Sequence, residues 1–329
     1  MSTGIDPVLR IEGLRTWFPV KRGLLRRTVG HVRAVDGVDL AIPARGTLAL
    51  VGESGCGKTT VGRSILRLVE PQDGRIWYDG VDLRTLSARE LHPYRRQLQI
   101  VFQDPLASLD PRMRVRDAIA EGMQAFRIGA NEAERTERVA ALMQQVGLAP
   151  EQMRRYPHEF SGGQRQRICI ARALAVEPRV IVCDEAVSAL DVSIQAQILN
   201  LLRDLQDQLG LAYLFITHDL SVVRYLADRV AVMYLGQIVE ERDTEELFTD
   251  ARHPYTQGLL AAVPGVDPNQ PGAAASVRGD VPSPADPPSG CRFHTRCAEA
   301  FERCPREAPP FYAVPTGASR CFLHDPAAG

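Results

Sequence analysis

Short apolar runs that stop abruptly at polar residues recur along the chain and predict buried strands. Four of them lie at residues 47–51, 100–102, 180–183 and 213–216. The run at 180–183 is apolar at every position, which is typical of a parallel strand covered on both faces. After the first run, Val61, Ile65 and Leu68 recur at helical spacing. The pattern therefore predicts an α/β fold in which strands alternate with helices.

The segments around these strands have patterns of their own. Residues 8–45 indicate short alternating strands, and the pair Asp79-Gly80 predicts a hairpin within residues 76–81. Residues 104–160 turn helical and polar, with a stop at Gly147 and a buried face made of Val139, Leu142, Met143 and Val146. From Val192 a long helix carries a second apolar stripe, made of Ile194, Ile198, Leu201, Leu205 and Leu209. Residues 264–290 are rich in proline, glycine and alanine, which predicts an extended linker before a small C-terminal appendage.

The first strand leads into a glycine-rich loop that matches the complete pattern G-x-x-x-x-G-K-[ST]. The loop reads Gly52-Glu53-Ser54-Gly55-Cys56-Gly57-Lys58-Thr59 and is followed by Thr60. Its glycines would let backbone N–H groups wrap around the β-phosphate of a nucleotide. Lys58 would neutralise the β- and γ-phosphates, and the hydroxyl of Thr59 would ligate Mg²⁺. The alternative is a glycine-rich turn with a chance lysine, which the strand–loop–helix context disfavours.

Three other strand ends carry candidate residues for hydrolysis. The strand at 180–183 ends in Asp184-Glu185, at the carboxyl edge where ligands bind in open α/β sheets. Asp184 suits outer-shell Mg²⁺ coordination, and Glu185 can polarise an attacking water. Gln103, after another strand, could reach Mg²⁺ and that water, while His218 would donate a hydrogen bond to the γ-phosphate. Each residue alone could equally belong to a solvated or capped turn, but their combination with the P-loop favours catalysis.

Ser161-Gly162-Gly163-Gln164 forms a second candidate phosphate site. A helical pattern follows it, so its hydroxyl and backbone N–H groups would lie at a helix N-terminus, which binds anions. Because the chain already has a P-loop, we expect this second site to serve a nucleotide held by another subunit. The segment therefore predicts a dimer with nucleotides sandwiched between its subunits. Asp191 follows the acidic pair at a spacing suited to a loop that contacts the partner.

These residues together resemble the ATP-binding subunits of ABC transporters, over residues 8–262. Three further segments resemble the oligopeptide and dipeptide importers in particular: FQDPLASLDPRM at 102–113, RYPHEF at 155–160 and HPYT at 253–256. The resemblance places the aromatic residue that stacks on adenine at Phe18, with Trp17 as the neighbouring candidate. Core aromatics of an edge strand are the alternative for both. One departure is Ala186, where the family usually has proline; the change frees a backbone N–H but removes no catalytic group.

The resemblance implies a P-loop ATPase of the ABC type, with a mixed β-sheet core, an antiparallel β subdomain and a helical subdomain at about residues 104–160. It places the ATPase domain at residues 8–262, and the linker and cysteine-rich C-terminal region at 263–329. The implied function is that of an importer motor. The implied partners are a second ABC ATPase subunit, in the family usually a paralogue, two membrane permease subunits and an extracytoplasmic substrate-binding protein. Peptides as cargo follow from the resemblance alone, since nickel, opines, peptide antibiotics and glutathione use similar motors.

Composition narrows the setting. The chain has 329 residues, of which 45% are apolar and 24% charged, as in an ordinary soluble globular protein. Its net charge of −1 disfavours broad nucleic-acid binding, and the basic cluster at 21–27 is expected to be a solvated loop, with a membrane or partner contact as the alternative. No apolar run approaches the roughly 20 residues that span a bilayer, and the N-terminus lacks the apolar region of a signal peptide. We expect a peripheral protein at the cytoplasmic face of the inner membrane.

Cysteines fall into two groups. Cys56, Cys169 and Cys183 lie in the predicted ATPase core and are expected to be small packing residues. The other four lie within 31 residues near the C-terminus: Cys291, Cys297, Cys304 and Cys321. In a reducing compartment a metal is a better expectation than disulfides. Their spacing lacks the C-x₂-C pairs typical of structural zinc, and the resemblance implies a [4Fe–4S] cluster. Zinc stays open as the alternative because His294 and His324 are nearby in sequence, and free thiols remain a third possibility.

Two other functions compete with the transporter motor: a soluble ABC ATPase that acts on DNA or ribosomes, and a nucleotide-binding regulator without turnover. Soluble ABC ATPases that act on DNA insert coiled coils or zinc modules before the Ser-Gly-Gly-Gln segment, and those that act on ribosomes usually carry two ATPase modules. Here only 57 residues separate Gln103 from Ser161, without heptads or cysteines, and one set of motifs is present. A nucleotide-binding regulator without turnover is disfavoured because Glu185 and His218 are both there.

Overall fold

The computed structural model describes residues 7–23, 27–262 and 279–328. These residues form two compact units that the chain visits alternately. The first unit contains, of the described residues, Ala44–Gly46 and Thr85–Ile216. The second contains Pro7–Pro43, Thr47–Arg84 and Thr217–Gly329. Each unit has its own strands and helices.

Three parallel strands form the centre of the first unit. They are β6 (Leu98–Val101), β7 (Val180–Asp184) and β8 (Ala212–Ile216), with β7 paired to both of the others. Every residue of β7 and β8 is buried, which confirms the prediction from their unbroken apolar pattern. Helix α2 (Ala88–Gln97) leads into β6, and α7 (Val192–Leu209) runs between β7 and β8. The predicted stripe of α7 is buried at Ile198, Leu201 and Leu205, and the helix ends at Gly210, whose φ of 66° suits a glycine C-cap.

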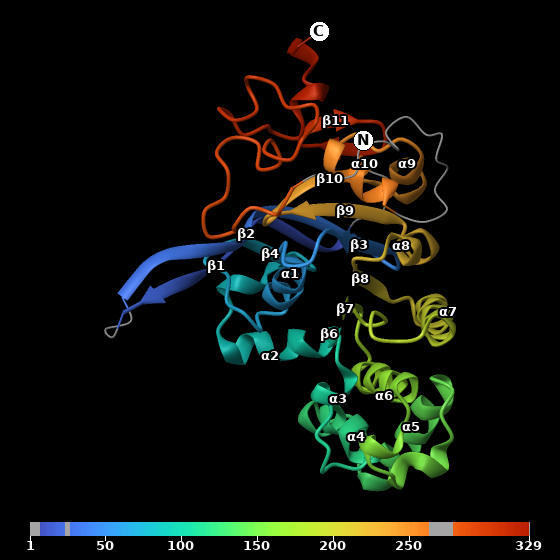
Figure 1. Ribbon diagram of the computed structural model, residues 1–329. Coiled ribbons are helices and arrows are strands. Elements are labelled where there is room, and N and C mark those ends of the chain that lie inside the picture. Colours follow the sequence, from blue (N-terminus) through green and yellow to red (C-terminus); the bar gives the residue numbers. More distant parts are fainter. Residues whose placement is uncertain (1–6, 24–26, 263–278, 329) are drawn as a thin grey trace. The chain divides into compact units, whose positions relative to one another are not determined.

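A group of helices completes the first unit and matches the predicted helical region (Figure 1). It consists of α3 (Pro105–Ser108), α4 (Val115–Ala125), α5 (Glu132–Gln145), η2 (Pro150–Arg154), η3 (Pro157–Glu159) and α6 (Gly162–Leu174). On α5 and just beyond it, Val139, Met143 and Val146 are fully buried, as their helical spacing predicts. Gly147 follows with a φ of 73°, which confirms it as the stop of this helix.

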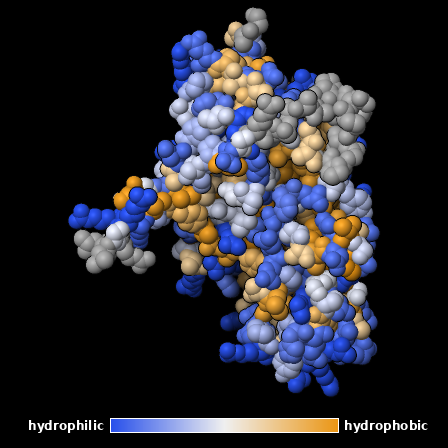
Figure 2. All heavy atoms as spheres, in the orientation of Figure 1, coloured by the Kyte–Doolittle hydropathy of each residue, from blue (hydrophilic) through white to orange (hydrophobic). Residues whose placement is uncertain are grey.

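The second unit contains an antiparallel sheet of four strands in the order β2-β1-β4-β5. The strands are β1 (Pro7–Arg22), β2 (Arg27–Pro43), β4 (Asp73–Tyr78) and β5 (Val81–Asp82), and η1 (Leu83–Thr85) follows. Asp79 and Gly80 both have positive φ, as the tight turn between β4 and β5 requires. The two long strands β1 and β2 extend together as an arm that carries both hydrophilic and hydrophobic residues (Figures 1 and 2). Lys21, Arg22 and Arg27 are exposed on this arm; residues 24–26 of the basic cluster lie outside the described residues.

The second unit also contains five strands of another sheet, in the order β11-β12-β10-β9-β3. They are β3 (Thr47–Val51), β9 (Arg229–Tyr234), β10 (Gln237–Asp243), β11 (Tyr312–Val314) and β12 (Gly317–Ser319). Strand β3 pairs with β9 in parallel, and the other pairs are antiparallel. The helices of this unit are α1 (Lys58–Ile65), α8 (Leu220–Leu226), α9 (Thr244–Thr249), α10 (Pro254–Ala261), η4 (Phe322–His324) and η5 (Pro326–Ala328). None of the helices in the described part of the chain is both long and apolar enough to cross a membrane.

The C-terminal region is joined to this sheet more closely than a sequence-defined appendage suggests. Strand β12 pairs with β10 from Glu240↔Ser319 to Arg242↔Gly317, so the end of the chain adds two strands to the sheet. Phe293 of the same region lies in the apolar core built by β3, β9, α9 and α10. The predicted linker at 264–290 lies outside the described residues up to 278. In the described end of this segment, after residue 278, the backbone carbonyl of Pro284 accepts a hydrogen bond from the N–H of Arg33 on β2.

Candidate functional site

The glycine-rich loop 52–59 joins β3 to α1, as predicted. Gly57 precedes the helix with a φ of 112°, a backbone conformation that residues other than glycine rarely adopt. A Cβ added to Gly57 would overlap the backbone carbonyl oxygen of Ala34, and one added to Gly52 would overlap that of Met233. Both glycines are therefore required by backbone that passes against the loop. Thr59 and Thr60 lie in the first turn of α1, half-buried.

The side chain of Lys58, the first residue of α1, folds back against the glycine-rich loop. This side chain is buried, and Nζ donates to the carbonyl oxygens of Gly52 at 2.8 Å and of Glu53 at 3.1 Å. These two hydrogen bonds hold the ammonium against the start of the loop. A positive charge beside a glycine-rich loop at a helix N-terminus would suit phosphate groups.

In the first unit, the structure brings two of the predicted catalytic residues into contact. Asp184 ends β7 and is buried, and Glu185 follows it with a φ of 49°, its N–H donating to the carbonyl oxygen of Ile216 at 3.0 Å. The amide Nε2 of Gln103 donates to Oε2 of Glu185 at 2.9 Å. The pairing of Val101 with Cys183 in the parallel strands β6 and β7 explains this contact, because both side chains follow the same edge. Ala186 is buried within the turn that follows Glu185.

Ser161 caps the N-terminus of α6, also in the first unit. Its hydroxyl accepts a hydrogen bond from the N–H of Gln164, and the Gln164 side chain accepts one from the N–H of Ser161 at 3.0 Å, which makes a reciprocal capping box. Ser161 and Gly162 are exposed. A Cβ on Gly163 would overlap Cγ2 of Ile194 on α7, so this glycine allows α6 to pack closely against α7. Asp191, at the start of α7, is exposed and its side chain does not cap that helix.

His218 and the two candidate aromatic residues lie in the second unit. His218 is exposed, and the N–H of the preceding Thr217 donates to the carbonyl oxygen of Leu50 on β3, the strand that leads into the glycine-rich loop. Phe18 is 40% exposed on β1. Trp17 is half-buried, its Nε1 donates to Asp36 at 3.2 Å, and the Arg33 guanidinium lies 5.2 Å from its ring centroid. Because Trp17 already has these partners, Phe18 is the more accessible of the two rings.

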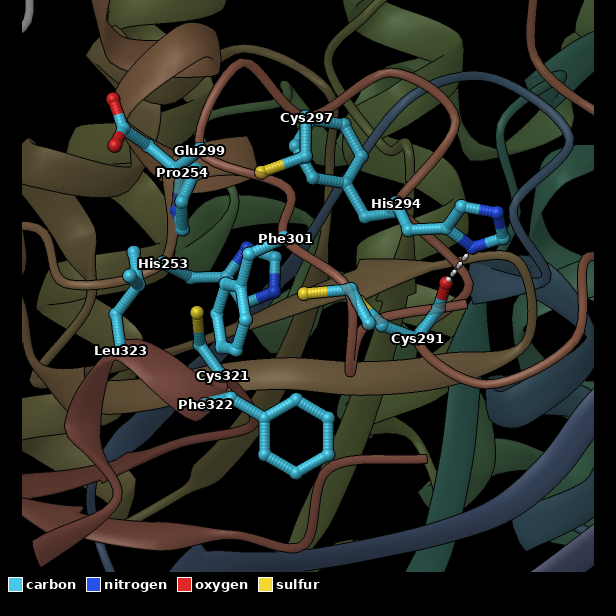
Figure 3. A pocket seen from close by; sticks show the side chains of 12 residues that line it. His253, Pro254, Cys291, His294, Cys297, Glu299, Phe301, Cys321, Phe322 and Leu323 are labelled. Atoms are coloured by element: carbon cyan, nitrogen blue, oxygen red, sulfur yellow. Dashed lines mark hydrogen bonds between the residues drawn. The ribbon is translucent and has the colours of Figure 1, made fainter. Parts of the chain in front are cut away.

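The four C-terminal cysteines line one pocket. Figure 3 shows the sulfur atoms of Cys291, Cys297 and Cys321 directed toward a common space, and Cys304 belongs to the same lining. Burial raises the pKa of Cys297 to about 11 and that of Cys321 to about 12, and the neighbouring cysteines contribute in the same direction. Cysteines spread over the C-terminal region thus converge on this one pocket.

No group of three or more His, Cys, Asp or Glu side chains among the described residues is arranged to hold a metal ion. The two histidines that kept zinc open are engaged with backbone. Nδ1 of His294 lies 2.8 Å from the carbonyl oxygen of Cys291, and Nε2 of His324 lies 3.0 Å from that of Arg252. By contrast, Cys56, Cys169 and Cys183 are buried in the core, as predicted for packing residues, and burial raises the pKa of Cys183 to about 12.

Sequence reasoning missed the residues that hold the glycine-rich loop from outside. The Tyr255 hydroxyl accepts a hydrogen bond from the N–H of Glu53 at 2.9 Å, and the Arg296 guanidinium pairs with the Glu53 carboxylate. Tyr255 belongs to the HPYT segment at 253–256, and the resemblance of that segment to the oligopeptide and dipeptide importers was the one available signal. Nothing in the local sequence around Arg296 points to a loop 243 residues away.

Comparison with known proteins agrees with this geometry. The ATP-binding cassette MJ0796, solved as a dimer in a post-hydrolysis state with ADP and phosphate, superimposes with a TM-score of 0.64 at 27% identity, covering 72% of this chain and 98% of that chain. Residues 35–188 match the ABC transporter family. The chain is therefore an ATPase of the ABC class.

A narrower assignment follows from the C-terminal region and from full-length relatives. Residues 239–304 match the oligopeptide/dipeptide transporter C-terminal region. The oligopeptide transport ATP-binding protein AppF of Bacillus subtilis is 48% identical over 325 residues, covering 97% of this chain and 98% of that protein. OppF of Haemophilus influenzae is 47% identical over 315 residues, covering 94% and 95%. The chain belongs to the ATP-binding proteins of the oligopeptide/dipeptide branch of ABC transporters.

Proposed function

We propose that the chain is the ATP-hydrolysing motor of an importer for di- or oligopeptides. The observation that carries the peptide assignment is the match of residues 239–304 to the oligopeptide/dipeptide C-terminal region, together with relatives named for oligopeptide transport along nearly their whole length. The motor would act with two membrane permease subunits and an extracytoplasmic binding protein, peripherally at the cytoplasmic face of the membrane.

Within the ATP site, each residue has a proposed role. Lys58 and the N–H groups of loop 52–59 bind the phosphates. Thr59, Gln103 and Asp184 help to coordinate Mg²⁺, directly or through its outer shell. Glu185 accepts the proton of the attacking water as its oxygen bonds to the γ-phosphorus and the bond to the β–γ bridging oxygen breaks. The 2.9 Å contact between Gln103 and Glu185 supports this role, because the amide fixes the carboxylate at the strand edge. His218 binds the γ-phosphate and Phe18 stacks on the adenine.

The Ser161–Gln164 segment is proposed to bind the nucleotide of a partner ATPase. Its exposed, capped helix N-terminus supports this role, and Asp191 would contact the partner beside it. The structurally similar cassette MJ0796 is described as a dimer, which supports the same arrangement. A paralogue, rather than a second copy of this chain, is proposed as the partner.

The cysteine region is proposed to hold a [4Fe–4S] cluster, with zinc as the alternative. The pocket supplies four thiols, which suit such a cluster. His253 and His294 line the same pocket, but Nδ1 of each already has a backbone partner, the N–H of Tyr255 and the carbonyl oxygen of Cys291. When bound, the cluster would tie the C-terminal segments together.

We propose an ATPase domain at residues 8–262, with its helical subdomain at about 104–160, and a linker with the cysteine region at 263–329.

The catalytic assignment is tested by comparing two variants of the purified chain with its partner subunits. Glu185→Gln should bind ATP with the parent affinity but lose about 10²–10⁴ in turnover, because an amide cannot accept the proton. Lys58→Ala should weaken ATP binding itself. Glu137→Gln, on the exposed face of α5, is the matched control and should hydrolyse ATP at the parent rate. Parent-like turnover in Glu185→Gln would refute the assignment of the base.

A further inference from the structure

Glu53, the second residue of the glycine-rich loop, forms a bidentate ion pair with the C-terminal region. Arg296 donates from one guanidinium nitrogen to Oε2 at 2.7 Å and from another to Oε1 at 2.9 Å. The Arg296 side chain is 5% exposed and that of Glu53 is 25% exposed. Two parallel bonds between a planar guanidinium and a carboxylate fix direction as well as distance. The pair therefore constrains where the loop begins.

Arg296 is itself held in place by an aromatic cluster. Its guanidinium lies 5.7 Å from the ring centroid of Tyr234 on β9. The Tyr234 ring packs 4.7 Å from that of Tyr255 and 5.3 Å from that of Phe293. Tyr255 accepts a hydrogen bond from the N–H of Glu53, so the aromatic cluster holds the backbone of this residue while Arg296 holds its side chain. Helix α10 and the segment that carries Arg296 thus both contact Glu53.

The segment that carries Arg296 has a second anchor. Arg292, one turn earlier, forms an ion pair with Asp36 on β2 and donates to the carbonyl oxygen of Leu235. Asp36 also accepts the bond from Trp17, next to the candidate adenine-stacking Phe18. The segment from Cys291 to Cys297 therefore connects the strand beside the adenine position to the phosphate loop. Its two arginines face acidic residues at both of these places.

The contact reaches the phosphate-binding group itself. The carbonyl oxygen of Glu53 accepts a hydrogen bond from Nζ of Lys58 at 3.1 Å, so a shift of Glu53 moves a partner of this ammonium. Removing one member of a largely buried ion pair leaves the other charge without compensation, which displaces the surrounding structure. Loss of Arg296 would therefore release the first turn of the loop.

We propose that Arg296 is a positioning residue of the ATP site, which holds the glycine-rich loop through Glu53 and so makes nucleotide affinity depend on the folded cysteine segment. The proposal rests on the ion pairs and on the ATPase class of the chain, and it is independent of which metal the cysteines hold. It gives the C-terminal region a function in the ATPase cycle: when the segment 291–297 loosens, this chain binds ATP less tightly.

The test is a double-mutant cycle on the full-length chain, read out as the equilibrium affinity for Mg-ATP. Arg296→Met and Glu53→Gln should each weaken binding about 10-fold, a size typical of coupling between sites. The double variant should bind no more weakly than the weaker single variant, because both changes remove the same contact. Turnover of Arg296→Met at saturating ATP should stay within about twofold of the parent, since Glu185 and Gln103 are unchanged.

Arg303→Met is the matched control. Arg303 lies in the same C-terminal region, pairs with Glu307 at 2.8 Å and Asp325 at 2.6 Å, and lies 4.1 Å over the Phe322 ring, away from the loop. It should keep the parent ATP affinity. If Arg296→Met does not fold, Arg296→Lys retains the charge without the bidentate geometry and should weaken binding by a smaller factor. Parent affinity in the Arg296 variants, additive losses in the double variant, or an equal loss in Arg303→Met would each overturn the proposal.

Discussion

Two glycines of the phosphate loop make a matched pair for testing the loop geometry. Gly55 and Gly57 both have positive φ, at 78° and 112°. An added Cβ on Gly55 meets no described heavy atom within 4 Å, whereas one on Gly57 would overlap the Ala34 carbonyl oxygen. Alanine at Gly55 thus adds backbone strain alone, whereas alanine at Gly57 adds a clash with a neighbouring strand.

The magnitudes follow from these two terms. A side chain in the left-handed region costs about 1–2 kcal/mol, which is all that Gly55→Ala should lose. Overpacking against fixed backbone adds about 1–3 kcal/mol, so Gly57→Ala should lose about 2–5 kcal/mol in all. Thermal denaturation without nucleotide measures the difference between the variants. With an unfolding entropy of about 2.1 cal/mol/K per residue in a chain of this length, it corresponds to a melting temperature lower by about 1–4 °C for Gly57→Ala than for Gly55→Ala. Equal melting temperatures in the two variants would refute the clash against Ala34.

Two further predictions concern the partner-facing helix and the cysteines. Ser161→Asp keeps an N-cap but places a carboxylate where we propose the partner's γ-phosphate, so the assembled pair should lose hydrolysis while this chain still binds ATP. The neutral cap Ser161→Asn is the control and should retain most of the activity. Equal hydrolysis rates in the two variants would contradict the shared site. Anaerobic preparations should be brown, absorb broadly near 400 nm and contain about four irons per chain. Cys321→Ser should lose this colour, whereas Cys169→Ser should keep it. Stoichiometric zinc in a colourless parent protein would contradict the cluster.

Local patterns predicted the parts of this fold that depend on neighbouring residues. Rules that act over a few residues account for the apolar strand at 180–183, the helix N-terminus at Ser161 and the stop at Gly147. The contact between Gln103 and Glu185 was also accessible, since parallel strands bring their carboxyl ends to one edge.

Contacts made by tertiary packing were not accessible. The pairing of β12 with β10, and the bond from Arg296 to Glu53, join residues that are far apart in sequence and carry no periodic signal. Only the folded chain shows that the cysteine segment lies against the phosphate loop. The same holds for the choice between Phe18 and Trp17, which depends on where Arg33 and Asp36 lie.

The central claim, that this chain is the motor of a peptide importer, is tested most directly by ATP-driven uptake. The complete transporter, assembled with its permease subunits and binding protein in proteoliposomes, is supplied with a labelled oligopeptide and with labelled nickel as the competing cargo. We predict peptide accumulation that requires ATP and disappears with Glu185→Gln in this chain. Accumulation of nickel instead of peptide, or peptide uptake that is unchanged in Glu185→Gln, would contradict the account.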